Sequence, residues 1–338
     1  HRDLHSFPTR RSSDLQGRVL AEDVVSAIGI PVFANSAMDG YAVRFADVAR
    51  TPATLRVVDD IAAGSADDPA AGPGECVRIM TGAPVPTFAD TVVPVEDTDG
   101  GQETVTVRVR PDAPGQFVRA SGDDFPAGTR VAAAGTTLTP AVAGALAAVG
   151  LVRVPVRPRP TLAVRATGDE LVSDGSPLGR GQIHESNSIA LTAMLDAAGA
   201  DVRRFDAAPD DAAALTAWLD GVRADLVVLT GGASVGAYDV VRDVLEAAGG
   251  TFRSVRVQPG KPQGWAVWNG VPVVSLPGNP LSAALSCEVF VRPLLDRILG
   301  RPERPWLTAV AGAEWASPAG RRQLVPVRLS TPADGRLV

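Results

Sequence analysis

The segment LTGGASVGAYD, residues 229–239, places three glycines and a carboxylate after an apolar run. Gly231, Gly232 and Gly236 let the backbone turn tightly and bring its N–H groups close to a ligand, which suits an anion. The spacing differs from the dinucleotide fingerprint G-x-G-x-x-G and from the phosphate loop ending in G-K-[ST]. A glycine-rich connection between a strand and a helix is the alternative interpretation of this loop.

Two further loops of unusual composition belong with it. The pattern predicts strands at 161–166, 225–230 and 271–276, and these precede TGDE, TGGASVG and LPGNP respectively. Ligands of parallel sheets bind beyond the carboxyl ends of the strands. We therefore expect the three loops to share one edge of a sheet.

The elements that must position these loops alternate between strand and helix. Helices are expected at 188–199, 210–222 and 239–249 and from about Pro280, with further strands at 201–206, 251–257 and 264–268. This alternation predicts right-handed crossovers onto a largely parallel sheet covered on both faces.

The earlier part of the chain has a different pattern of expected elements. Residues 54–138 hold short β-like runs bounded by Gly, Pro and Asp, and a short helix is expected after Thr139 and Pro140. The proline-rich stretch 154–160 is a natural boundary. A last β-rich piece is expected from about Leu307.

Composition limits the function classes. The 338 residues exceed the usual size of one core, which predicts two or more domains. A net charge of −6 gives no general attraction for nucleic acid or anionic membrane. Two distant cysteines suit a reducing cytosol, and the apolar stretch 141–152 is too short to span a bilayer. Residues 1–15 resemble a translated sequencing adapter, and we expect a fragment open at both ends.

Six motifs carry a family resemblance: NSAMDGYAVR (35–44), RIMTGAPVP (78–86), TGDEL, TGGASVGAYD, QPGKPQG and LPGNPLS. In this order, the chain resembles the MoeA, gephyrin E-domain and plant molybdenum-insertase family from about Gly17 to the last residue. The resemblance implies a multidomain α/β plus β protein. Its expected parts are a non-native segment (1–15), a linking domain (16–50 and 127–157), a β-rich inserted domain (51–126), a MogA-like α/β domain (158–303) and a truncated C-terminal β-domain (304–338).

The resemblance also implies the reaction. A molybdopterin molybdenumtransferase takes adenylylated molybdopterin and molybdate and releases AMP and molybdenum cofactor. The substrate carries its own dithiolene sulfurs, so the protein needs oxyanion donors and carboxylates for Mg²⁺ rather than cysteine ligands. A cytoplasmic homodimer is implied, with possible transient contact with the molybdopterin adenylyltransferase. The rival functions are a CinA-type nucleotide hydrolase and a non-enzymatic gephyrin-like scaffold.

The site residues follow from the same resemblance. The functional acids are Asp39, Asp124, Glu170, Asp210 and Asp239. Glu170 and Asp239 are the expected Mg²⁺ ligands because they follow adjacent strands, and Asp239 is expected to be an exposed loop carboxylate. The substrate-binding residues are Thr81, Arg119, Thr167, Gly168, Asn187, Gly231, Gly232, Ser234, Gly236, Lys261, Pro277, Gly278, Asn279 and Pro280.

Some residues depart from the family pattern or allow a simpler role. Gln258 stands where many relatives carry a lysine, and Glu185 and Ser121 also differ from the common residues. Asp210 could instead cap the following helix. Lys261 could be an ordinary surface lysine and His184 a structural or solvent-facing residue.

Overall fold

The computed structural model describes residues 9–11, 15–232 and 239–330, which form two compact units. Unit 1 comprises residues 1–22, 134–140 and 153–338, and unit 2 comprises residues 23–133 and 141–152. The fold class predicted from the sequence, a multidomain α/β plus β protein, is confirmed. None of the described helices is long and apolar enough to cross a membrane.

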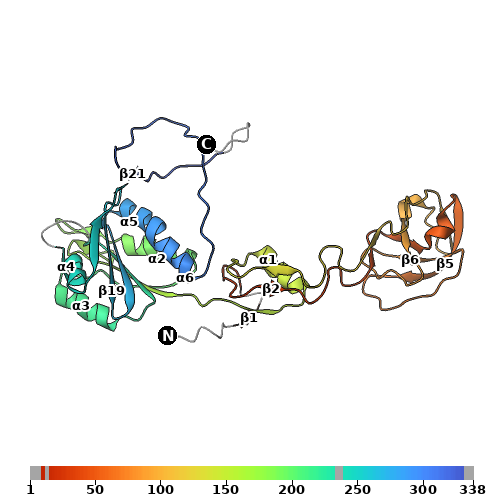
Figure 1. Cartoon of the computed structure of the whole chain (residues 1–338), viewed down its shortest axis with the longest axis horizontal. Helices are drawn as coiled ribbons and strands as arrows, with labels where there is room; N and C mark the ends of the chain where they lie inside the picture. The colour runs from red at the N-terminus through yellow and green to blue at the C-terminus, as the bar shows by residue number, and fades with distance from the viewer. Residues whose placement is uncertain (1–8, 12–14, 233–238, 331–338) are drawn as a thin grey trace. The chain divides into compact units, whose positions relative to one another are not determined.

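Unit 1 is built on a six-stranded sheet with the order β15-β12-β16-β20-β19-β17 (Figure 1). Its strands are β12 (Thr161–Ala166), β15 (Asp201–Arg204), β16 (Leu226–Thr230), β17 (Thr251–Ser254), β19 (Pro262–Trp268) and β20 (Val271–Leu276). The first four strands in the sheet order pair in parallel, whereas β19 is antiparallel to both β20 and β17. The antiparallel pair follows from the two-residue Asn269–Gly270 turn, which is too short for a parallel crossover.

Helices cover both faces of this sheet (Figure 1). One face packs against α3 (Ala212–Gly221) and α4 (Val240–Ala247), and the other against α2 (Asn187–Ala197), α5 (Pro280–Ser286) and α6 (Arg292–Ile298). A π-helical segment, η4 (Cys287–Val291), joins α5 to α6. Leu162 and Val164 of β12 point to the α2 side and Ala163 to the α3 side, as strand alternation requires.

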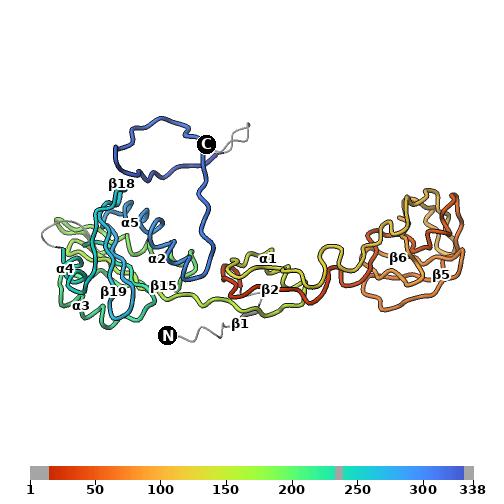
Figure 2. The backbone as a smooth tube through the Cα atoms, in the orientation of Figure 1, coloured from red at the N-terminus to blue at the C-terminus, as the bar shows by residue number. Residues whose placement is uncertain are grey.

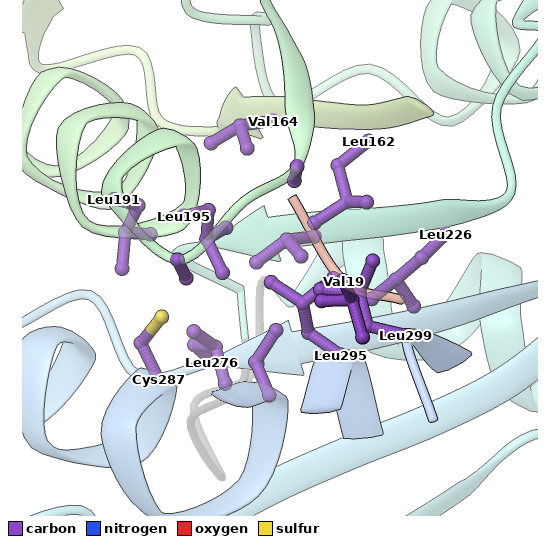
Figure 3. Packing of buried hydrophobic residues seen from close by; sticks show 14 residues of the cluster. Val19, Leu162, Val164, Leu191, Leu195, Leu226, Leu276, Cys287, Leu295 and Leu299 are labelled. Atoms are coloured by element: carbon purple, nitrogen blue, oxygen red, sulfur yellow. The ribbon is translucent and has the colours of Figure 1, made fainter. Parts of the chain in front are cut away.

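The core on the α2 side combines residues from distant parts of the sequence. Val19 packs with leucines of the sheet and helices (Figure 3), among them Leu162, Leu191, Leu195, Leu226, Leu276, Leu295 and Leu299. Unit 1 also contains β1 (Thr9–Arg11), which pairs with β11 (Arg153–Pro155), and the parallel pair β13 (Leu171–Val172) and β14 (Ile183–His184).

The described residues 301–330 contain the short strand β21 (Arg322–Gln323), which pairs in parallel with β18 (Val257–Gln258). Most side chains of this stretch are exposed, including Trp306 and Leu307. Figure 2 shows the stretch as a long open loop of backbone. The β-rich piece expected there is therefore represented by one strand among the described residues.

Unit 2 contains a five-stranded sheet with the order β7-β4-β6-β5-β8. Its strands are β4 (Gly40–Val43), β5 (Ala53–Ile61), β6 (Glu75–Ile79), β7 (Thr91–Pro94) and β8 (Thr104–Val107). Both faces carry buried apolar side chains. The unit also includes β2 (Val24–Val25) with β10 (Arg130–Ala132), β3 (Asn35–Ser36) with β9 (Val118–Arg119), the 3₁₀ turns η2 (Phe45–Val48) and η3 (Val95–Asp97), and most of α1 (Pro140–Ala148). The domain boundaries expected from the sequence stay a prediction.

Candidate functional site

Three loops meet at the carboxyl edge of the parallel strands. They begin at Thr167, Gly231 and Pro277, directly after the neighbouring strands β12, β16 and β20. Asn187 ties two of these strand ends to α2, because its Nδ2 donates to Thr230 Oγ1 at 3.1 Å and to the Gly278 carbonyl oxygen at 2.7 Å. The predicted grouping of the loops at one edge is confirmed, and we call them the edge cluster.

Backbone approaches backbone closely in the edge cluster. Gly231 has φ +94°, and a Cβ there would overlap the Thr167 carbonyl oxygen. A Cβ on Gly278 would lie 3.5 Å from the Gly231 Cα. Gly231 is therefore required by the packing of its loop against the Thr167 loop as well as by its positive φ, whereas the contact at Gly278 is an ordinary one.

A buried hydroxyl faces this tight region. Thr167 is 5% exposed, and its Oγ1 has no hydrogen-bond partner among the described residues. A Cβ on Gly231 would lie 3.0 Å from this oxygen. Buried hydroxyls are normally paired, so Thr167 Oγ1 suits a ligand or an ordered water. Ser234 and Gly236, the other predicted residues of this loop, lie outside the described residues.

Acidic residues gather beside the edge cluster. Asp169 Oδ1 accepts a hydrogen bond from the Asp210 N–H at 3.0 Å, and Glu170 is exposed. Burial raises the pKa of the Asp210 carboxyl, a hydrogen bond from the Asp169 backbone N–H lowers that pKa, and the negative charges of Asp169 and Glu170 raise it. The capping role considered for Asp210 belongs instead to Asp211, whose carboxylate accepts from the Ala214 N–H at 2.7 Å at the start of α3.

Asp239 is buried rather than exposed, so that expectation was wrong. It is 7% exposed and is the N-cap of α4, where its Oδ1 accepts from the Arg242 N–H at 3.3 Å. A Cβ on Gly232 would lie 2.9 Å from the same oxygen. Because it caps α4, the Asp239 carboxylate lies next to Gly232, at the start of the loop that Asp239 ends.

The turn between β18 and β19 carries Lys261, which is exposed, and follows Gln258, the last residue of β18. Arg321 Nη1 lies 3.5 Å from Gln258 Oε1, because β21 pairs with β18. A guanidinium thus stands beside the position where Gln258 replaces the expected lysine. Arg321 is not among the residues predicted from the sequence, where its only signal is a pair of arginines at 321–322.

Glu185 precedes Ser186, the N-cap of α2, and its side chain accepts hydrogen bonds from the first turn of that helix. It is buried, and its carboxylate accepts from Ser188 N at 2.7 Å and Ser188 Oγ at 2.6 Å at the start of α2. Glu185 therefore holds the helix end that bears Asn187. His184 is exposed on β14, in line with the solvent-facing role considered for it. Asn279 caps α5 by accepting from the Ser282 N–H at 3.2 Å, with Pro280 in the first turn.

Gly168, another predicted residue, is buried in unit 1 and its N–H donates to the Ala208 carbonyl oxygen at 3.0 Å. Four predicted residues lie in unit 2 and form two pairs. Thr81 donates from both its N–H and its hydroxyl to Asp39 Oδ1, at 2.7 Å each. These hydrogen bonds, the hydroxyl first, lower the pKa of Asp39. Arg119 Nη2 lies 2.7 Å from both carboxylate oxygens of Asp124. Lys261 and the edge cluster belong to unit 1.

A cavity of about 550 Å³ lies at the opposite edge of the six-stranded sheet. Thr161 and Val271, the first residues of β12 and β20, line it with Asp225 and Trp268. None of the predicted site residues that the structure describes borders this cavity. Its position at the amino ends of the parallel strands separates it from the loops considered above.

Comparisons with known proteins agree with the resemblance. A model of the MoeA N-terminal region (domain I and II) matches residues 3–150, and a model of a probable molybdopterin binding domain matches residues 163–297. "Molybdopterin molybdenumtransferase 2" of Mycobacterium tuberculosis (strain CDC 1551 / Oshkosh) is 49% identical over 323 residues, which cover 91% of this chain and 80% of that protein. "Molybdopterin molybdenumtransferase 1" of the same strain is 40% identical over 349 residues, covering 95% of this chain and 82% of that protein.

Solved structures extend this similarity to the fold. The crystal structure of a molybdopterin biosynthesis moeA protein from Pyrococcus horikoshii matches with a TM-score of 0.75 and 34% identity, covering 88% of this chain and 76% of that one. A second structure of such a protein from Pyrococcus horikoshii OT3 matches with a TM-score of 0.81 and 27% identity, covering 94% and 81%. The identity and coverage of the curated relatives decide the assignment. The chain belongs to the MoeA family of molybdopterin molybdenumtransferases.

Proposed function

We propose that the edge cluster binds the adenylylated pterin and that the protein transfers molybdenum from molybdate to it, releasing AMP. The observation that carries this assignment is the convergence of three loops fastened by Asn187. The backbone N–H of Gly232, which has φ +65°, suits a phosphate oxygen, whereas the Gly231 N–H donates to the Leu276 carbonyl oxygen. The Thr167 hydroxyl adds a donor at the same place.

Positive charge is proposed to come from the neighbouring turn. Lys261 is exposed there and acts as a point charge toward phosphate or molybdate. Arg321, beside Gln258, offsets the cation that Gln258 lacks. One oxygen of molybdate passes to the phosphorus of AMP as the phosphoanhydride bond breaks, and the pterin keeps its own phosphate. The two dithiolene sulfurs take the place of that oxygen on molybdenum and release their protons. These cations stabilise the charge that develops on the leaving phosphate.

The acids suit Mg²⁺ by the type of their donors. Carboxylate oxygens are hard ligands, and the charges of Asp169 and Glu170 already disfavour ionisation of Asp210, which a cation would relieve. Among the residues that the structure describes, no three His, Cys, Asp or Glu side chains are grouped closely enough to hold a metal ion. We therefore propose Glu170 and Asp239 as ligands that share the ion with substrate phosphates. Bound Mg²⁺ would neutralise phosphate charge.

The two pairs of unit 2 are proposed as groups that bind polar parts of a ligand. Asp39, held by Thr81, presents a fixed carboxylate, and Arg119, held by Asp124, presents a guanidinium of set orientation. Both arrangements favour recognition of polar groups over general surface attraction. A homodimer, a cytoplasmic location, supported by two free and buried cysteines, and contact with the adenylyltransferase remain predictions.

A matched pair of glycine variants tests the proposal. Gly231→Ala inserts a methyl group against the Thr167 carbonyl, whereas a Cβ on Gly221 at the end of α3 meets open space. Titration with AMP and molybdate together, and an insertion assay, should show loss of binding and turnover for Gly231→Ala and parent-like values for Gly221→Ala. A folded parent that binds neither AMP nor molybdate, or equal behaviour of the two variants, would contradict the proposed function.

A further inference from the structure

Lys261 is the only lysine in the sequence. It lies in the turn between β18 and β19, and its carbonyl oxygen accepts from the Val255 N–H at 2.8 Å. A lysine side chain has four rotatable bonds, so the position of its ammonium depends first on where the backbone is held. The fastening of this turn therefore decides which anion Lys261 can meet.

The turn is fastened to α5. Gly260 is buried with φ +90°, and a Cβ there would lie 2.8 Å from Ser286 Oγ. Gln263 Nε2 donates to the Gly260 carbonyl oxygen at 2.9 Å and to Ser286 Oγ at 2.7 Å. One amide group thus joins the turn to the helix that begins next to Asn279 of the edge cluster.

The orientation of the Gln263 amide leaves a buried oxygen atom without a hydrogen-bond partner among the described residues. Both amide hydrogens are used, while Gln263 Oε1 is buried and has no hydrogen-bond partner among the described residues. Reversing the amide would place this oxygen against the Gly260 carbonyl, so the orientation is determined by its acceptors. A buried acceptor without a partner lowers the net stabilisation from such a side chain. Stability alone is a weak reason for a glutamine here.

We propose that Gln263 is a positioning residue, which fixes the Gly260 turn on Ser286 and so aims Lys261 at the anionic substrate. This inference rests on the proposed function, since it assumes that Lys261 meets phosphate or molybdate. Gln263 itself touches no substrate. Its removal leaves the lysine charged and present but lets the turn move away from α5.

The single lysine makes this directly measurable. An amine-reactive acylating reagent can modify one side chain, Lys261, and mass spectrometry of its peptide separates this from the N-terminal amine. AMP with molybdate should protect Lys261 in the parent. In Gln263→Leu the half-protecting concentration should rise about threefold to tenfold, because two neutral hydrogen bonds are lost, and in Ser286→Ala about twofold to threefold.

The controls separate positioning from folding. Gln263→Leu loses two hydrogen bonds, but it fills a similar volume and removes a buried unpaired oxygen, so its melting temperature should fall only slightly below that of the parent. Gln102→Leu, the same substitution at an exposed position of unit 2, should keep parent-like protection. In the insertion assay KM should rise more than kcat falls for Gln263→Leu.

Each other outcome has a definite meaning. Equal protection of Lys261 in the parent and in Gln263→Leu would overturn the inference while leaving the proposed function in place. A second result would also overturn the inference: Lys261 is less protected in both Gln263→Leu and Ser286→Ala, and the two variants lose unfolding free energy in proportion to that loss of protection. The role of Gln263 would then be purely structural. A parent whose Lys261 is not protected at all would overturn the role of Lys261 and the inference together.

Discussion

Replacing Asn187 by alanine should loosen the edge cluster by a predictable amount. The change removes the donations to Thr230 Oγ1 and to the Gly278 carbonyl, and two neutral hydrogen bonds contribute about 1 to 3 kcal/mol in total. Gly278 is exposed, so its carbonyl can bind water instead. Alanine also favours the helix by roughly 0.5 kcal/mol. The expected net loss of unfolding free energy is about 1 to 2 kcal/mol.

Tryptophan fluorescence reports on the unfolding of unit 1, which contains Asn187. All five tryptophans, at positions 218, 265, 268, 306 and 315, belong to unit 1. Thermal unfolding followed by their emission should shift down by roughly 2 to 8 °C in Asn187→Ala. Affinity for AMP should fall as well, because the loops that Asn187 holds are the proposed binding surface.

A double-variant cycle tests the reasoning behind this magnitude. Thr230→Val removes the hydroxyl that Asn187 contacts and that itself donates to the Pro277 carbonyl at 3.1 Å. Since the two single variants lose one bond in common, the double variant should lose about 0.5 to 1 kcal/mol less than their sum. Strict additivity, or an Asn187→Ala protein as stable as the parent with unchanged AMP affinity, would refute the clamp.

Other substitutions probe single charges. Burial raises the pKa of Asp210, so the ionised carboxylate destabilises the fold at pH values above its ordinary pKa of 3.8 and has no such effect below it. Asp210→Asn should therefore melt higher than the parent at pH 7 and equally at about pH 3, yet insert less molybdenum. Equal melting at both pH values would contradict this. Asp239→Asn should keep the cap of α4 and lose molybdenum insertion activity. Asp239→Ala should lose that activity and also about 1 kcal/mol of unfolding free energy, measured by urea unfolding. Full insertion activity in Asp239→Asn would exclude a role as metal ligand. Lys261→Ala should weaken AMP binding at low salt and less so at high salt; affinities that match the parent at every ionic strength would identify an ordinary surface lysine.

The elements of the α/β unit were predictable because their signals are local. The buried run of β16 spans 5 residues and the periodic pattern of α4 spans 8, and each pattern favours one type of structure within its own short window. Caps were less predictable. Asp210 and Asp211 are adjacent and chemically identical, and only the path of the chain into α3 decides that Asp211 accepts from Ala214 while Asp210 lies beside Asp169.

The sequence by itself determined the family, the order of strands and helices, and the three loops that must share a sheet edge, since motif spacing and hydrophobic periodicity are properties of the chain alone. Tertiary structure decided which groups meet across long separations. Asn187 reaches Gly278, Arg321 reaches Gln258, and β19 reverses direction against β20. Such contacts depend on strand pairing and on the packing of helices against the sheet. Many sequences would form the same helices and strands, and only the assembled core determines which of these elements lie next to one another.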